Sequence, residues 1–281
     1  MKNKIKYSFL TILTFICINF IQGCQKNPAT GDREINLLSE SEEDAIGKSE
    51  HQKIIKQFGG EYQSEKLKNY VESLGNFLVS TSELSNKKFT FTILNTPIIN
   101  AFALPGGFIY LTRGLIYLCQ NEAQLAGVIA HEIGHVTARH SARRYTKSVG
   151  TGVILQILNV FSKNNFVNNL LGQSAQLYLL SYSRSQEYQA DELAVRYMIR
   201  AGFDAKEMAN FLRIMEEFSE VQREIFKINN KVSELLKTHP NSSKRVQEVI
   251  ENYKGKIQLN PIVGKEVFLK KIDGIDYGDK P

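Results

Sequence analysis

The sequence contains three cysteines and no tryptophan. Cys17 lies within an apolar N-terminal segment and Cys24 closely follows that segment, so Cys119 is the one cysteine in the main body of the chain. A single thiol cannot form an internal disulfide. Because Cys119 ends an apolar run, we expect it to be a buried small side chain rather than a nucleophile. The sequence therefore predicts a fold that holds together without disulfides.

Long hydrophobic runs are also missing. After residue 24, no stretch reaches the ~18 apolar residues that indicate a membrane-spanning helix, so an integral membrane protein is disfavoured. Residues 149–161 are apolar but too short to cross a bilayer, and two interpretations stay open: a buried hairpin element, or a lip that faces lipid or substrate. The net charge is +6, with no basic stripe interleaved with aromatic residues, so nucleic acid is not expected as a partner.

The first 23 residues have the layout of a secretory signal peptide. Three lysines within the first six residues precede an apolar stretch at 7–21. The pair Gly23-Cys24 then resembles the bacterial lipobox, which implies cleavage before Cys24 and attachment of lipid to its sulfur. Several acyl chains would anchor the protein stably to a membrane. An ordinary cleaved signal and an uncleaved anchor are the alternatives.

The remaining patterns predict helices around a few strands. Capping boxes and apolar periodicity indicate the helices, while alternation and a Pro-Gly-Gly turn indicate a strand and a hairpin. The expected helices cover residues 39–58, 64–80, 121–145, 185–200, 204–227 and 240–253, and the expected strands cover residues 89–93, 98–104 and 108–112. The predicted fold class is α+β, mostly helical, with a small antiparallel sheet.

The segment 131–135, His-Glu-Ile-Gly-His, carries the strongest functional signal. On a helix, positions i and i+4 lie about 40° apart, so His131 and His135 can share a tetrahedral cation such as zinc. Glu132 lies beside that face, where its carboxylate can act as a general base. The flanking residues are apolar, and polar groups on a buried helix require partners. A zinc ion would be such a partner; the alternative is a chance match on a core helix.

Spacing alone does not settle the third ligand. Position 141 is Ser141, so the longer metzincin pattern, which needs a histidine there, fails. His140 would lie on the opposite face of a continuous helix and is expected to be structural or at the surface. Glu187 and Asp191 lie one turn apart, with the small Ala190 between them allowing two helices to approach. Glu187 could complete a His₂Glu site and Asp191 could orient a histidine; a solvated helix face is the alternative.

Five ordered motifs resemble those of M48 zinc metallopeptidases. They are Asn-Ala-Phe-Ala-Leu-Pro-Gly-Gly at 100–107, Asn-Glu-Ala-Gln-Leu-Ala at 121–126, the His-Glu-Ile-Gly-His segment, Arg-Ser-Gln-Glu-Tyr-Gln-Ala-Asp at 184–191, and Thr-His-Pro at 238–240 followed by Arg245. The resemblance covers about residues 26–255, and segments 27–31 and 36–39 are similar to the start of periplasmic lipoprotein members. It implies a zincin-like domain with Glu187 as the third zinc ligand.

The resemblance and the local pattern suggest two further roles. His239, in a rigid Thr-His-Pro turn, is the expected donor to the developing oxyanion. The strand around Asn100, Ala101, Phe102 and Ala103 is expected to bind substrate by strand addition, which selects extended chain.

Together these features predict a zinc metalloendopeptidase with one Zn²⁺ per chain that hydrolyses unfolded or misassembled envelope proteins. Lipid on Cys24 would place it in the bacterial cell envelope, facing the periplasm at the outer membrane. A client-binding, chaperone-like lipoprotein with a weak or silent zinc site is one alternative, and a zinc hydrolase with a non-peptide substrate is another.

The expected domain organisation follows. Residues 1–23 form the signal peptide, 24–38 a polar tether and 39–255 the peptidase domain. Residues 256–281 form a C-terminal segment that resembles the start of a further region in longer relatives.

Overall fold

The fold consists of helices arranged around a small sheet. The computed structural model describes residues 24–147, 181–226, 239, 243–256, 258–276 and 278. The described helices are α2 (Glu40–Gln57), α3 (Glu65–Ser80), α4 (Arg113–Leu118), α5 (Glu122–Thr137), α8 (Arg184–Arg200), α9 (Lys206–Phe226), α11 (Ser243–Tyr253) and α12 (Lys265–Ile272). The described strands are β1 (Cys24–Lys26), β2 (Arg33–Ile35), β3 (Thr90–Leu94), β4 (Ala101–Leu104) and β5 (Phe108–Thr112). This content confirms the predicted fold class, whereas the predicted signal peptide and the apolar segment 149–161 lie outside the described residues.

The three-stranded sheet is mixed, which corrects the prediction of an antiparallel sheet. Its strand order is β3-β5-β4. Strands β4 and β5 form the predicted antiparallel hairpin, whereas β3 runs parallel to β5. The prediction failed because the chain leaves β3 for the far edge, forms β4 there and returns along the centre, and no local sequence pattern encodes that crossing. Among the described strands, β4 therefore forms an edge of the sheet.

Capping side chains set the starts of two helices as the sequence indicated. Ser39 and Glu42 form the capping box of α2. The Asn121 side chain accepts a hydrogen bond from the N–H of Gln124 at the start of α5. Helix α5 thus begins at a defined residue, which fixes the direction of every later side chain on it.

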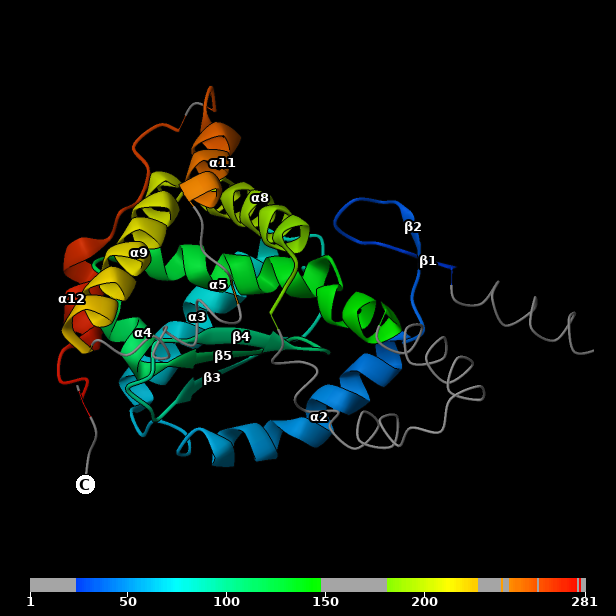
Figure 1. Ribbon diagram of the computed structural model, residues 1–281, viewed down its shortest axis with the longest axis horizontal. Coiled ribbons are helices and arrows are strands. Elements are labelled where there is room, and N and C mark those ends of the chain that lie inside the picture. The colour runs from blue at the N-terminus through cyan, green and yellow to red at the C-terminus, as the bar shows by residue number, and fades with distance from the viewer. Residues whose placement is uncertain are drawn as a thin grey trace, which may run out of the picture.

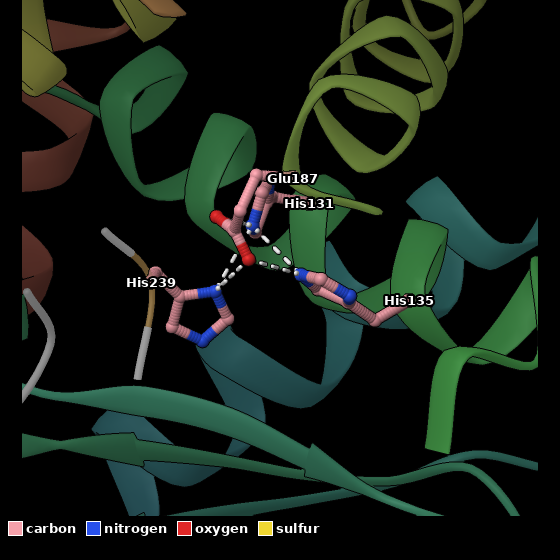
Figure 2. A group of neighbouring side chains, drawn as sticks. All are labelled: His131, His135, Glu187 and His239. Atoms are coloured by element: carbon pink, nitrogen blue, oxygen red, sulfur yellow. Dashed lines mark hydrogen bonds and ion pairs between the residues drawn. The ribbon is translucent and has the colours of Figure 1, made fainter. Parts of the chain in front are cut away.

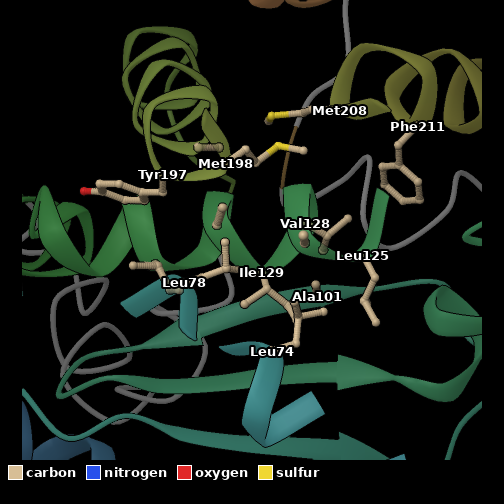
Figure 3. Close-up of a cluster of buried hydrophobic side chains, with 14 of the residues drawn as sticks. Leu74, Leu78, Ala101, Leu125, Val128, Ile129, Tyr197, Met198, Met208 and Phe211 are labelled. Carbon is tan, nitrogen blue, oxygen red and sulfur yellow. The ribbon is translucent and has the colours of Figure 1, made fainter. Parts of the chain in front are cut away.

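Helix α5 runs between the sheet and helices α8 and α9 (Figure 1). Figure 3 shows Leu125 and Ile129 of α5 directed toward the sheet, near Ala101 of β4. Met198 of α8 and Met208 of α9 lie on the opposite side, and all five side chains are buried. A helix that is covered on all sides keeps its polar side chains away from bulk water. The histidines of α5 therefore need partners from within the protein or from a bound ion.

Helix α5 ends earlier than the predicted residue 145. Arg139 has a φ angle of 52°, in the left-handed region that arginine rarely adopts. Its guanidinium donates to the carbonyl of Leu38 at 2.8 Å and lies 3.4 Å from the Glu43 carboxylate. These contacts hold the interruption, after which residues 140–147 are helical again.

The interruption overturns the expected position of His140. The expectation of an opposite face assumed a continuous helix, and the left-handed residue breaks that periodicity. His140 is fully buried, and its Nδ1 lies 2.8 Å from Nδ1 of His135. It is therefore a structural histidine beside the proposed metal ligands.

The segment that the sequence predicts to be a tether contains a hairpin. Strands β1 and β2 pair antiparallel, with Cys24 opposite Ile35. Asn27 is buried, and its Nδ2 donates to Oε1 of Glu34 and to the carbonyl of Ala138 just after α5. The hairpin therefore packs against the end of α5.

Helix α12 was not predicted from the sequence. Its Phe268 is fully buried, and the carbonyl of Val263, just before it, accepts a hydrogen bond from the N–H of Ala123 in α5. This part of the C-terminal segment therefore packs against the start of the central helix. Within the described ranges, no helix combines the length and the apolar character needed to cross a bilayer.

Candidate metal centre

Two histidines one turn apart on α5 face the same point. Figure 2 shows the imidazoles of His131 and His135 directed toward Glu187 and His239. Nε2 of His131 lies 3.0 Å from Nε2 of His135, and both side chains are buried. The i, i+4 spacing thus produces the convergence that the sequence indicated.

Helix α8 brings a carboxylate to this point because it packs closely on α5. A Cβ atom added at Gly134 of α5 would lie 3.1 Å from the carbonyl oxygen of Ala190 in α8. Small residues on both helices allow this approach. Oε2 of Glu187 comes to 3.5 Å from Nε2 of His131, and Oε1 comes to 3.5 Å from Nε2 of His135.

The alternative of a solvated face for Glu187 and Asp191 is wrong, since both side chains are 0% exposed. The buried Arg245 of α11 donates through Nε and NH2 to the two oxygens of Asp191, at 2.8 and 2.7 Å. Its NH1 lies 2.8 Å from Oε2 of Glu187. One guanidinium therefore holds both carboxylates. Oδ1 of Asp191 also lies 2.9 Å from Nδ1 of His131, the ring nitrogen that faces away from the cluster.

The donor atoms fit a tetrahedral cation. One ligand atom each from His131, His135, Glu187 and His239 lies within 4.8 Å of the other three. Four ligands about 2.0–2.1 Å from a tetrahedral zinc ion would lie about 3.3–3.4 Å apart, and several of the donor pairs here lie 3.0–3.5 Å apart. The Asp191 carboxylate, 2.9 Å from Nδ1 of His131, favours a hydrogen on that nitrogen, and the Nε2 lone pair is then directed into the cluster. Imidazole and carboxylate donors are those that zinc binds in open sites.

Glu132 lies beside the cluster. Its Oε1 is 3.5 Å from Nε2 of His239, while its buried Oε2 has no hydrogen-bond partner within the described part of the chain. Burial raises the pKa of Glu132 above its usual range, which suits a carboxylate that must accept a proton.

His239 reaches both the cluster and Glu132. Its Nδ1 lies 3.1 Å from Oε1 of Glu187 and 3.3 Å from Nε2 of His131. This places His239 within ligand distance of the same ion, in addition to the predicted role of a donor to an oxyanion. Both roles are open to a side chain in this position.

Charge partners set the protonation of the cluster. Burial alone would raise the pKa of Glu187, but His239 and Arg245 hold it well below its usual range. Burial alone would lower the pKa of His131, but its hydrogen bonds to Asp191 and Glu187 raise it to about 9. Glu187 is thus held in its anionic form, and the histidine position attracts positive charge, whether from a proton or from a metal ion.

An apolar cavity, open in part to solvent, encloses about 430 Å³ of space next to His131 and Glu132. Side chains of α9 and one turn of α5 form most of its wall. The lining residues are Gly127, Val128, Met208, Phe211, Leu212 and Met215, together with His131, Glu132, His239 and Arg245. A wall of this composition accommodates an apolar side chain close to the proposed reaction centre.

The predicted substrate strand lies at the sheet edge near the cluster. Strand β4 pairs only with β5 among the described strands, and it packs against α5. Asn100 anchors its start, because the N–H of Asn100 donates to Oγ1 of Thr112 and its carbonyl accepts from the Thr112 N–H. A second cleft of about 230 Å³ lies between the end of β4 and the end of α5, where Ala103, Leu104 and His135 are among the lining residues.

Sequence reasoning missed several neighbours of the cluster. Arg245 stands out in the sequence only as part of a motif, without any sign of its carboxylate partners. Tyr182 stacks on His135, with ring centroids 3.7 Å apart. His140 and Gln189 are hydrogen-bonded to each other at 2.9 Å. For the last three residues, no local pattern gave a signal, because their contacts depend on the interruption after α5 and on the position of α8.

The sequence profile of peptidase family M48 matches residues 65–252, which is more than half of the chain. The matched range begins at α3, ends within α11 and includes every residue of the candidate metal centre.

Several named proteases and metalloendopeptidases are similar to this chain in sequence. A beta-barrel assembly-enhancing protease of Yersinia pestis is 32% identical over 212 residues, which are 72% of this chain and 42% of the relative. The protein of the same name from Escherichia coli (strain K12) is 32% identical over 191 residues, 65% of this chain and 38% of the relative. The mitochondrial metalloendopeptidase OMA1 of Schizosaccharomyces pombe is 28% identical over 230 residues, 80% of this chain and 65% of the relative. The chain thus spans about two fifths of the bacterial relatives and just under two thirds of the yeast one. With its matched range and its histidine–glutamate cluster, the chain belongs to peptidase family M48.

Proposed function

We propose that this protein is a zinc-dependent endopeptidase. The observation that carries the proposal is the convergence of His131, His135 and Glu187 on one buried point, with Glu132 beside it. These three side chains would hold the ion, and His239 would be either a fourth ligand or a donor to the oxyanion. Two imidazoles and one carboxylate form the ligand set of open, catalytic zinc sites.

The chain's own groups account for the proton transfers of peptide hydrolysis. A bound zinc ion would polarise the scissile carbonyl and lower the pKa of a neighbouring water. Glu132 accepts a proton from the attacking water and returns it to the leaving amine, so that the peptide bond yields a carboxylate and an amine. Nε2 of His239 lies close enough to Glu132 to donate a hydrogen bond to the oxyanion that forms between these two steps.

The surroundings of the cluster favour an extended polypeptide as substrate. Strand β4 offers its edge to a backbone, and the apolar cavity accepts a side chain. A folded protein rarely presents extended backbone together with exposed apolar side chains, whereas an unfolded or misassembled one does. The names of the bacterial relatives support envelope proteins as the substrates.

The N-terminal sequence supports a lipid anchor on Cys24 and a location at the periplasmic face of the outer membrane. Cys24 is also the first residue of β1, which pairs with β2 on the folded domain. An anchored protein would therefore be held close to the membrane, where misassembled envelope proteins would be encountered.

Ligand roles can be separated by two variants of α8. Glu187→Ala would remove a ligand and should abolish zinc binding at micromolar metal. Asp191→Ala would remove the hydrogen-bond acceptor of His131 and should weaken zinc binding roughly 10–100-fold without abolishing it. Zinc content after dialysis and chelator competition would measure both effects. Glu192→Ala, on the same helix with an exposed side chain, is the matched control and should bind zinc as the wild type does. If Asp191→Ala emptied the site while Glu187→Ala stayed loaded, the two roles would be reversed.

Glu132→Gln tests the reaction itself. We expect the variant to keep its zinc and to lose at least ~10²-fold in the rate of casein cleavage, because the general base is gone. Zinc content and cleavage would be measured on the same purified preparation. Near-wild-type turnover would contradict the assigned role. If the wild type bound zinc and unfolded clients without cleaving them, the chaperone-like alternative would replace the proposal.

The apolar cavity predicts a cleavage preference. Met215→Trp would fill the cavity and should lower cleavage next to large apolar side chains about 10-fold or more, since small steric changes in a pocket alter discrimination by one to two orders of magnitude. Phe211→Leu would enlarge the cavity and should raise cleavage next to large apolar side chains. Mass spectrometry of cleavage sites in a peptide library would measure both, with Val221→Trp, an exposed position of the same helix, as the control. An unchanged site distribution in both cavity variants would rule out this role.

Cys24→Ser tests the anchor. We expect loss of lipidation and release from the membrane fraction, because the acyl chains provide the membrane affinity. Fractionation and mass spectrometry of the mature N-terminus would show it. An unmodified mature N-terminus in the wild type would contradict the lipobox interpretation.

A further inference from the structure

His131 and His135 have different partners at Nδ1, the ring nitrogen that faces away from the cluster. His131 has a carboxylate, Asp191, at its outward nitrogen. His135 has another histidine in that place: its Nδ1 lies 2.8 Å from Nδ1 of His140, and Nε2 of His140 lies 2.9 Å from Oε1 of Gln189. His135 and His140 are both buried. The contact at Nδ1 of His135 involves no other proposed ligand and has no role in the proposed reaction.

The contacts from His135 through His140 to Gln189 form a series of hydrogen bonds. The direction of each bond follows from Gln189, at the end away from the metal ligands. Arg143 NH1 lies 3.1 Å from Oε1 of Gln189, and a guanidinium only donates hydrogen bonds. Oε1 of Gln189 therefore also accepts the hydrogen on Nε2 of His140. In a neutral His140, Nδ1 is then the acceptor, and His135 must donate its own Nδ1 hydrogen to it. This leaves the Nε2 lone pair of His135 directed into the cluster, as a metal ligand requires.

The ring plane of His135 is held as well. Tyr182 stacks on the imidazole with an interplanar angle of 20°, and the guanidinium carbon of Arg144 lies 3.8 Å from the centroid of the Tyr182 ring. His135 is thus restrained at its edge by His140 and on a face by Tyr182. Both restraints depend on residues that follow the interruption of α5.

The series continues to the N-terminal hairpin. NH2 of Arg143 lies 2.6 Å from Oε1 of Glu34 in β2. The same oxygen accepts a hydrogen bond from Nδ2 of Asn27, whose backbone N–H donates to the carbonyl of Asp32 and closes the hairpin loop. An unbroken series of hydrogen bonds therefore joins β2 to His135. The hairpin lies outside the range matched by the family profile, which begins at residue 65.

We infer that His140 and Gln189, fixed by Arg143 and Glu34, are positioning residues that orient His135 for metal binding and make the N-terminal hairpin part of the metal centre. The inference rests on the proposed function through the assignment of His135 as a ligand. It adds that the strength of metal binding depends on a segment outside the matched peptidase range.

Zinc affinity by chelator competition, with the absorption spectrum of the cobalt(II)-substituted protein, tests the inference without measuring proteolysis. His140→Leu removes the acceptor for His135 and should weaken zinc binding roughly 10–100-fold, with a changed cobalt spectrum. His140→Gln, whose amide oxygen can accept the same hydrogen, should restore most of the affinity. Gln189→Leu should weaken binding and Gln189→Glu, which keeps an acceptor for His140 and Arg143, should not.

Glu34→Ala extends the test to the hairpin. Glu34 is partly exposed and remote from the ligands in sequence, so the variant should fold. Because Arg143 loses its partner in the hairpin, we expect zinc affinity to fall several-fold below that of the wild type. Thermal unfolding would be followed for every variant. His51→Leu, which removes a remote histidine bonded to the Tyr110 hydroxyl at 2.8 Å, is the matched control and should leave zinc affinity unchanged.

The outcomes separate the inference from the proposed function. A wild type that binds no zinc would overturn both. A wild type that binds zinc, with His140→Leu and Glu34→Ala binding equally well, would overturn the positioning role alone. Equal losses in His140→Leu and His51→Leu would also overturn it, because the effect would then reflect general stability.

Discussion

The balance of buried charges around α8 constrains both the protonation of the site and the packing of α8 against α5. Glu132, Glu187 and Asp191 are buried carboxylates, and Arg245 is the buried guanidinium that pairs with two of them. With all three carboxylates ionised, these four groups carry two excess negative charges in a region shielded from water, where unpaired charge is strongly disfavoured. A divalent cation would neutralise them. Burial raises the pKa of Glu132 above its usual range, and the hydrogen bonds of His131 to Asp191 and Glu187 raise the pKa of that histidine to about 9 against the effect of burial.

This charge balance also explains the close packing of α5 and α8. Arg245 can hold Glu187 at the histidines only if the two helix axes come close together, and Gly134 opposite Ala190 permits that distance. A larger side chain at Gly134 would push against backbone atoms of α8, which cannot move without displacing both carboxylates. The small residues therefore serve the ligand geometry in addition to the packing of the core.

The sequence predicted those parts of the site that depend on local spacing. His131 and His135 converge because they lie one turn apart on one helix, and Asn121 caps that helix as its pattern indicated. Glu187 could be identified only through a motif, because spacing left it equivalent to Asp191. The position of His140 could not be predicted at all. It depends on the left-handed conformation of Arg139, which is held by contacts to residues about a hundred positions away in the chain, and no local pattern records such contacts.

The apolar cavity and the second cleft lie at opposite ends of the histidine pair. The apolar cavity is lined by His131 and the second cleft by His135, so the clefts lie on either side of the histidine pair along α5. Strand β4 ends at the second cleft, because Leu104 is one of its lining residues. A polypeptide paired with the edge of β4, as proposed above, would therefore reach the second cleft where β4 ends. An apolar side chain would enter on the His131 side, while the cleft on the other side is bordered by the Glu43–Arg139 pair. The Glu43–Arg139 pair also maintains the interruption of α5, so the groups that border the second cleft are the same ones that bring His140 to His135.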